Sequence, residues 1–268
     1  MTKSVKIDAG HGGSDSGAIG FGVFEKDWTL KMSLYQFKRL KELGAKVGMT
    51  RTNDKTLSSS QRTNLIKNKY DYCISNHFNA FNGKARGIET IHSIFGSKSF
   101  ATSIANELVK TTGLPLRRVF SLKGSNGLDY YFMHRMTGST ETIIVEYGFI
   151  DNKTDHDWYK NESNFYKAGE AVIRAICKEI GISYKTPGGS VNTKPIKDKS
   201  KLFKVQTGAF SKKSNAENLA KKLKKDGYET FIIYDKLYKV QTGAFSEKSN
   251  AEKLASKLKK DGYETFII

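Results

Sequence analysis

Four residues with metal-binding or acid–base side chains occur where the sequence would display them rather than pack them. His11 lies between glycines directly after an apolar run, and His77 follows a second apolar run. Glu25 precedes a helical pattern, and Glu146 closes a third strand-like run. Two histidines and one glutamate can form a catalytic zinc site, which uses three protein ligands and leaves the fourth position to water. A separate carboxylate can act as the base for that water.

The elements expected to position these residues alternate between strand-like and helical patterns. Short apolar runs predict strands over 5–7, 46–49, 72–75, 87–94, 130–133 and 142–145. Apolar residues at helical spacing predict helices over 28–43, 58–66, 99–112 and 165–181, and a basic loop covers 117–127. Strands that alternate with helices indicate an α/β fold with a largely parallel sheet flanked by helices. Ligands of such sheets bind at the carboxyl ends of the strands, where both histidines are expected.

Residues 183–200 separate this pattern from the rest of the chain. The segment is rich in Pro, Gly and Ser and has almost no apolar residues, which is typical of a linker. The sequence therefore predicts a first domain over 1–182, a linker over 183–200 and a second domain over 201–268.

The second domain is an internal repeat. Residues 203–233 align with residues 238–268 and differ from them at four positions. Each unit predicts a strand, a helix that opens with Ser-Asn-Ala-Glu, and a second strand. One such unit can hardly bury its own apolar face. The two are therefore expected to pack as one small α+β domain, a ferredoxin-like βαββαβ sheet with both helices on one side.

The four candidate residues lie in motifs of a known family. The order Asp-x-Gly-His-Gly-Gly, Glu-Lys-Asp, Ser-Asn-His-x-Asn and Val-Glu-x-Gly-Phe-Ile-Asp-Asn resembles the zinc-dependent N-acetylmuramoyl-L-alanine amidases of bacterial and phage cell-wall lysis. The resemblance spans roughly residues 1–182. It implies hydrolysis of the peptidoglycan amide between N-acetylmuramic acid and L-alanine. It also implies that His11, Glu25 and His77 are zinc ligands and that Glu146 is the catalytic carboxylate.

The repeat resembles a second family through Lys-Val-Gln-Thr-Gly-Ala-Phe and its Asn-Ala-Glu helix start. This family is the sporulation-related repeat, a peptidoglycan-binding module, and the resemblance implies binding to glycan strands. We expect the sheet face near Gln206 and Gln241 to contact the sugar. The helices of the repeat are rich in lysine, and we expect their outer face to contact anionic wall polymers.

Composition narrows the partners and the compartment. The formal net charge of +18 favours anionic surfaces, but no nucleic-acid motif or arginine-rich block appears, which argues against a nucleic-acid partner. No apolar run suits a signal peptide or a membrane helix. We therefore expect no membrane insertion, synthesis in the cytoplasm, and action on the wall after release by phage lysis or mother-cell lysis. We also expect a monomer, with Cys73 and Cys177 as buried free thiols.

Other interpretations of the same residues stay open. A His-Glu-His zinc site serves many amides, so a zinc peptidase that cuts another bond of the wall peptide is one alternative. A catalytically inactive wall-binding protein is another, although the presence of all four site residues argues against it. The remaining histidines have no motif context and are expected to be satisfied locally: His92, His134 and His156. Three basic residues are expected to be solvated rather than to bind substrate carboxylates: Arg117, Arg118 and Lys123.

Overall fold

The computed structural model describes residues 3–187, 203–228, 230–245 and 248–268. The chain forms two compact units, Met1–Pro187 and Gly188–Ile268, and each is described by itself. From residue 188 onward, the linker predicted over 183–200 lies outside the described residues. The domain limits therefore stay predictions.

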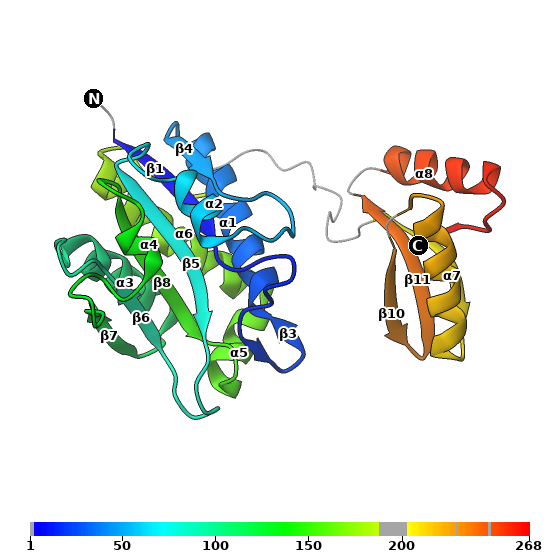
Figure 1. Ribbon diagram of the computed structural model, residues 1–268, viewed down its shortest axis with the longest axis horizontal. Coiled ribbons are helices and arrows are strands. Elements are labelled where there is room, and N and C mark those ends of the chain that lie inside the picture. The colour runs from blue at the N-terminus through cyan, green and yellow to red at the C-terminus, as the bar shows by residue number, and fades with distance from the viewer. Residues whose placement is uncertain (1–2, 188–202, 229, 246–247) are drawn as a thin grey trace. The chain divides into compact units, whose positions relative to one another are not determined.

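A six-stranded sheet forms the centre of the first unit (Figure 1). Its strands, in spatial order, are β4 (Lys46–Met49), β1 (Ser4–Ala9), β5 (Tyr72–Asn79), β8 (Glu141–Phe149), β6 (Ile88–Ile91) and β7 (Leu116–Phe120). Neighbouring strands are parallel except β6 and β8, which are antiparallel. A short hairpin of β2 (Ile19–Gly20) and β3 (Val23–Phe24) leads into the first helix. The predicted α/β fold with a largely parallel sheet is confirmed.

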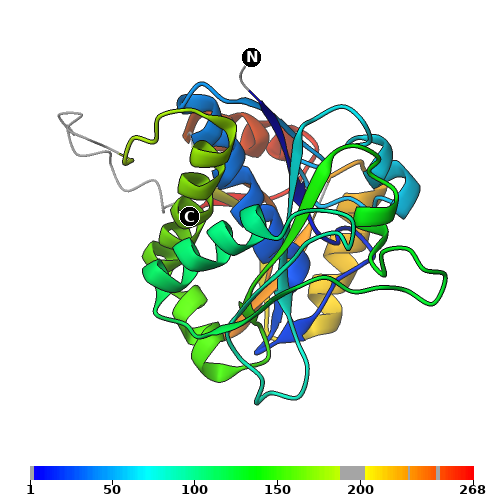
Figure 2. The same cartoon turned by 90° about the vertical axis from the view of Figure 1, so that its left-hand side faces the viewer.

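The two faces of this sheet are covered unequally. Three long helices, α1 (Glu25–Glu42), α3 (Ser99–Thr112) and α6 (Glu162–Ile180), lie together on one face, where the main apolar core forms (Figure 2). The short helix α5 (Lys153–Lys160) precedes α6. The opposite face packs a smaller apolar cluster against two short helices, α2 (Ser59–Asn64) and α4 (Phe132–Arg135). One cavity of the first unit lies on this second face.

Two sequence predictions about the second face were wrong. The strand predicted over 130–133 is replaced by the turn before α4 and by α4 itself. Four consecutive apolar residues do not distinguish a strand from a helix, and here the main-chain amide of His134 bonds the carbonyl of Tyr131. The loop predicted over 117–127 begins instead as strand β7, because its first residues pair with β6. Both cysteines are buried and free, as predicted.

The second unit is a four-stranded antiparallel sheet with two helices. Its strands, in spatial order, are β10 (Phe231–Asp235), β11 (Leu237–Phe245), β9 (Phe203–Phe210) and β12 (Phe266–Ile267). The helices α7 (Lys213–Lys225) and α8 (Lys248–Lys260) share one apolar core with Val205 and Val240 of the central strands. Both helices therefore pack on one face of the sheet, as the βαββαβ prediction requires.

Candidate metal centre and active site

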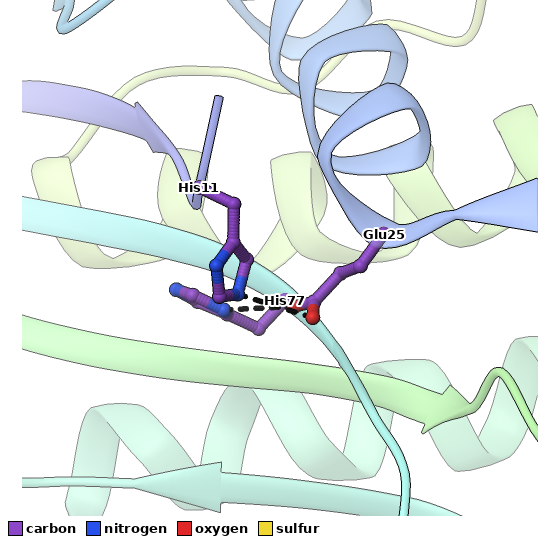
Figure 3. Close-up of side chains that lie close together, drawn as sticks. All are labelled: His11, Glu25 and His77. Carbon is purple, nitrogen blue, oxygen red and sulfur yellow. Dashed lines mark hydrogen bonds and ion pairs between the residues drawn. The ribbon is translucent and has the colours of Figure 1, made fainter. Parts of the chain in front are cut away.

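Three predicted metal ligands converge on one point at the edge of the second face. His11 comes from the turn after β1, Glu25 is the first residue of α1, and His77 lies in β5. The Glu25 carboxylate contacts both rings, at 3.1 Å from His11 Nε2 and 2.9 Å from His77 Nδ1 (Figure 3). All three donor atoms lie within 4.8 Å of one another, and they form the one such group among the described residues.

This donor set fits a zinc ion. Zinc prefers tetrahedral sites of His nitrogen and carboxylate oxygen, in which bonds of about 2.1 Å place neighbouring ligand atoms roughly 3.4 Å apart. The two contacts to Glu25 are close to that spacing. A second observation is that Glu146 Oε2, in the same cavity, is buried without a hydrogen-bond partner among the described residues. The arrangement thus offers three ligands and one spare acceptor.

Two glycines allow the ligands to approach so closely. A Cβ atom on Gly10 would lie 2.3 Å from Cε1 of His77, and one on Gly17 would lie 2.6 Å from both the Glu25 carboxylate and the His11 ring. Gly17 also has a φ of +64°, which side chains disfavour. The glycines around His11 therefore make space for the ligand cluster as well as for a tight turn.

Two buried arginines fix the turn that presents His11. Arg51 donates to the carbonyls of Ala9 and Gly10, and Arg62 donates to the carbonyls of Ala9 and His11. His11 has a φ of +57°, a strained conformation for a residue with a side chain, and these bonds hold it there. Three consecutive main-chain carbonyls are thus bound by guanidinium groups.

Asp8 and Asp15 support the same turn. Asp8 is fully buried and accepts hydrogen bonds from Arg62, Thr50 and Ser75. Burial raises the pKa of Asp8, but the Arg62 charge and the hydrogen bonds outweigh it and lower the pKa overall. Asp15 Oδ2 lies 2.9 Å from His11 Nδ1, so that nitrogen carries the proton and Nε2 keeps its lone pair for a metal ion.

Sequence reasoning missed these supporting residues. An acid within the apolar run that forms β1 was a usable signal for Asp8, because a buried carboxylate needs a partner. The spacing of four residues between His11 and Asp15 was a weaker signal for the role of Asp15. Nothing in the sequence separates Arg51 and Arg62 from the many surface cations.

Glu146 faces the donor cluster from the neighbouring strand. In the sheet register it lies directly opposite His77, so both side chains point to the same face. Both line a cavity of about 430 Å³, whose walls also include Asn79, Tyr131 and Phe132. The histidine and the glutamate do not end their strands, as the apolar runs suggested, since β5 and β8 continue for two or three residues beyond them.

The surroundings shift the pKa values of the two glutamates of the site in opposite directions. Burial raises the pKa of Glu25, but hydrogen bonds with His11 and His77 reverse this and lower it well below the usual range. Glu25 is therefore ionised at neutral pH, as a metal ligand must be. Burial raises the pKa of Glu146 well above the usual range, and the nearby charges of Glu25 and Glu89 act in the same direction. A cation bound nearby would lower the pKa of Glu146 again, because a positive charge favours the ionised carboxylate.

The other histidines lie outside the donor cluster. His92 contacts the carbonyl of Ser93, and the His156 ring packs against the rings of Phe21 and Trp28 at tilted angles. His134 is buried, and burial lowers its pKa to about 4. His134 Nε2 is buried without a hydrogen-bond partner among the described residues, so the expectation that all three histidines are satisfied locally stays a prediction for His134.

Comparison with known proteins identifies the first unit. A profile of the N-acetylmuramoyl-L-alanine amidase family matches residues 5–178, which is more than half of the chain. The chain belongs to the N-acetylmuramoyl-L-alanine amidase family. A profile of the SPOR domain, which is the sporulation-related repeat expected from the sequence, matches residues 199–268.

Curated relatives and solved structures agree with the amidase assignment. N-acetylmuramoyl-L-alanine amidase CwlM of Bacillus licheniformis is 31% identical over 85% of this chain and 83% of its own length. The sporulation-specific N-acetylmuramoyl-L-alanine amidase of Bacillus subtilis is 30% identical, with the same two coverages. The catalytic domain of the amidase CwlV from Bacillus (Paenibacillus) polymyxa is 27% identical, with a TM-score of 0.61 over 68% of this chain and 99% of that one.

The amidase is therefore a peptidoglycan hydrolase that its SPOR domain targets to the cell wall. Zinc dependence is general in the amidase family. In the part of the chain that the structure describes, no helix combines the length and the apolar character needed to cross a membrane.

Proposed function

We propose that His11, Glu25 and His77 hold one zinc ion in this amidase, and that Glu146 is the base of the hydrolysis. The observation that carries the proposal is the meeting of three donor atoms within 4.8 Å, next to a cavity lined by Glu146. When bound, zinc supplies Lewis-acid chemistry, because it polarises a carbonyl and makes water more acidic.

The side chains of the protein supply the proton transfer and the shape of the cavity. Glu146 Oε2, which has no other partner among the described residues, accepts a proton from the attacking water and returns it to the L-alanine nitrogen as that nitrogen leaves. Burial and the nearby charges of Glu25 and Glu89 raise the pKa of Glu146, which makes its carboxylate a stronger proton acceptor. Tyr131 and Phe132 give the same cavity an aromatic wall.

Mass spectrometry of digested peptidoglycan tests the bond that is cut. We expect intact glycan strands with a free lactyl carboxylate, and stem peptides with a free amine on L-alanine. Digestion with a muramidase of known specificity provides the reference fragments. New amines on any residue inside the stem peptide would instead identify a zinc peptidase, and the assignment of the bond would be wrong.

In the SPOR domain, a row of residues across the open sheet face supports glycan binding. The register places Phe231 opposite Gln241, Gln241 opposite Gln206, and Gln206 opposite Phe266, one residue from each strand. One sequence neighbour of each residue packs in the core against the helices, so we take all four to point to the opposite face: Val205, Ile232, Val240 and Ile267 are these neighbours. The two phenylalanines are 63% and 60% exposed.

We propose that this row is the glycan contact, with rings that stack on sugars and amides that bond hydroxyls. Gln241 is only 8% exposed, so Gln206 and the two phenylalanines would make most of the contact. In the full chain, replacing Phe231 and Phe266 with Ala should weaken binding to purified peptide-free glycan by at least about tenfold, as expected for exposed aromatic anchors. The matched control is Tyr234→Ala, an exposed aromatic outside the row.

Pelleting assays with labelled glycan measure this effect. Wild-type affinity in the double Phe variant would show that glycan binds elsewhere on the domain. Binding to anionic wall polymers through the lysines of α7 and α8, a monomeric state, and arrival at the wall after cell lysis stay predictions.

A further inference from the structure

The active site continues as a straight row across four strands. His77 on β5 lies opposite Glu146 on β8, Glu146 lies opposite Glu89 on β6, and Glu89 lies opposite Arg118 on β7. Residues directly opposite each other share a face of the sheet, so the row runs from the metal ligands to a guanidinium group. Adjacent strands are ~4.8 Å apart, which separates the main chains of Glu146 and Arg118 by roughly 10 Å.

Glu89 is the centre of a charged cluster in this row. Its side chain is 2% exposed, and its carboxylate accepts hydrogen bonds from Arg117, Arg118 and Asn79. An irregularity in the pairing of β6 and β7 adds one residue to β7, which lets two consecutive arginines reach the same carboxylate. Asn79 also lines the catalytic cavity, so the cluster adjoins the cavity wall.

The cluster carries one positive charge more than Glu89 requires. One arginine would neutralise the buried carboxylate, yet two are bound, and their side chains are 41% and 51% exposed. Arg117 uses only Nε, and Arg118 uses Nε and Nη2, so the other guanidinium donors have no hydrogen-bond partner among the described residues. The Arg118 guanidinium also stacks on the Phe120 ring at 3.8 Å, which restricts its orientation.

We propose that Arg118, supported by Arg117 and held by Glu89, binds a carboxylate of the stem peptide on the residue that follows L-alanine. This inference rests on the proposed function, because it takes the scissile amide to lie beside Glu146. Consecutive residues of a peptide are about 3.8 Å apart, so that carboxylate lies roughly 6 Å from the scissile amide. The row of residues from Glu146 to Arg118 is long enough to include both the scissile amide and that carboxylate. A planar guanidinium with free donors suits a carboxylate, which it can bind through two parallel hydrogen bonds.

A matched pair of substrates tests the assignment. Two muropeptides that differ only in the residue after L-alanine, with a free carboxylate in one and a carboxamide in the other, are hydrolysed by the full-length protein. We expect wild-type kcat/KM to be about tenfold higher for the carboxylate, mainly through KM, because a charge-assisted bidentate pair is lost with the amide. In Arg118→Gln, the ratio of the two kcat/KM values should fall to nearly one.

Further variants separate this role from a structural one. A loss of stability alone would lower both rates equally and leave the ratio unchanged, which would overturn the proposal. Arg118→Lys keeps the positive charge but loses the two parallel N–H donors of the guanidinium, so it should retain part of the preference for the carboxylate substrate. Lys110→Gln removes an exposed cation from the last turn of α3, outside the row, and should keep the full preference.

Two results would contradict the carboxylate assignment specifically. One is equal wild-type rates on the two muropeptides. The other is an Arg118→Gln defect confined to walls that carry phosphate polymers, which would make the arginines a wall-phosphate site. If neither muropeptide is cut at the muramoyl amide, the proposed function fails rather than the subsite.

Discussion

Replacing Glu146 with Gln is expected to lower turnover of peptidoglycan by about 10²–10⁴-fold, the usual contribution of a general base. Gln keeps the size and polarity of the side chain but has no site that can take and return the proton. Metal content should stay at one ion per chain, since the three donor atoms belong to other residues. Turnover is measured by release of dyed wall fragments, and bound metal by elemental analysis.

Glu141→Gln is the matched control for this variant. Glu141 lies on the same strand, five residues earlier, and does not line the cavity. The Glu146 variant should also be at least as stable as the wild type, because its buried carboxylate has an unpaired oxygen. A loss of metal in place of a loss of turnover would make Glu146 a ligand, and one of the three assigned ligands would then be wrong.

Removal of the metal should abolish activity completely, and added zinc should restore it. Loss of activity is also expected without chelator for His77→Ala, because two remaining donors cannot complete a catalytic site of three protein ligands. His92→Ala is the control, since His92 contacts the carbonyl of Ser93 and belongs to no group of metal donors among the residues that the structure describes. Full lysis by protein shown to be free of metal would contradict the site.

Much of the site could be predicted because its ligands lie in local patterns. His11 and His77 follow apolar runs, and Glu25 begins a helix, so their elements were visible in the sequence. Their convergence required a parallel pairing of β1 and β5, which alternation of strands and helices made the natural expectation.

The remaining parts depend on register and burial, which the sequence does not display. Glu89 and Arg118 join the site only because β6 runs antiparallel to β8 and pairs with β7, an arrangement that strand-like runs alone do not specify. Arg117 and Arg118 were interpreted as part of a solvated loop. Their strand was missed because an edge strand with charged residues lacks the apolar run by which strands were predicted. Arg51 and Arg62 looked like surface cations, yet they bind main-chain carbonyls inside the fold. Long basic side chains are usually exposed, so composition favoured the wrong environment for them.

The most direct measurement for this account is anomalous diffraction from crystals of the purified full-length protein, recorded on both sides of the zinc absorption edge. We predict one zinc peak in the first unit, about 2 Å from His11 Nε2, His77 Nδ1 and the Glu25 carboxylate. Glu146 should face that peak without binding it directly. No peak at these three residues in catalytically active crystals, or a peak bound by Glu146, would contradict the account.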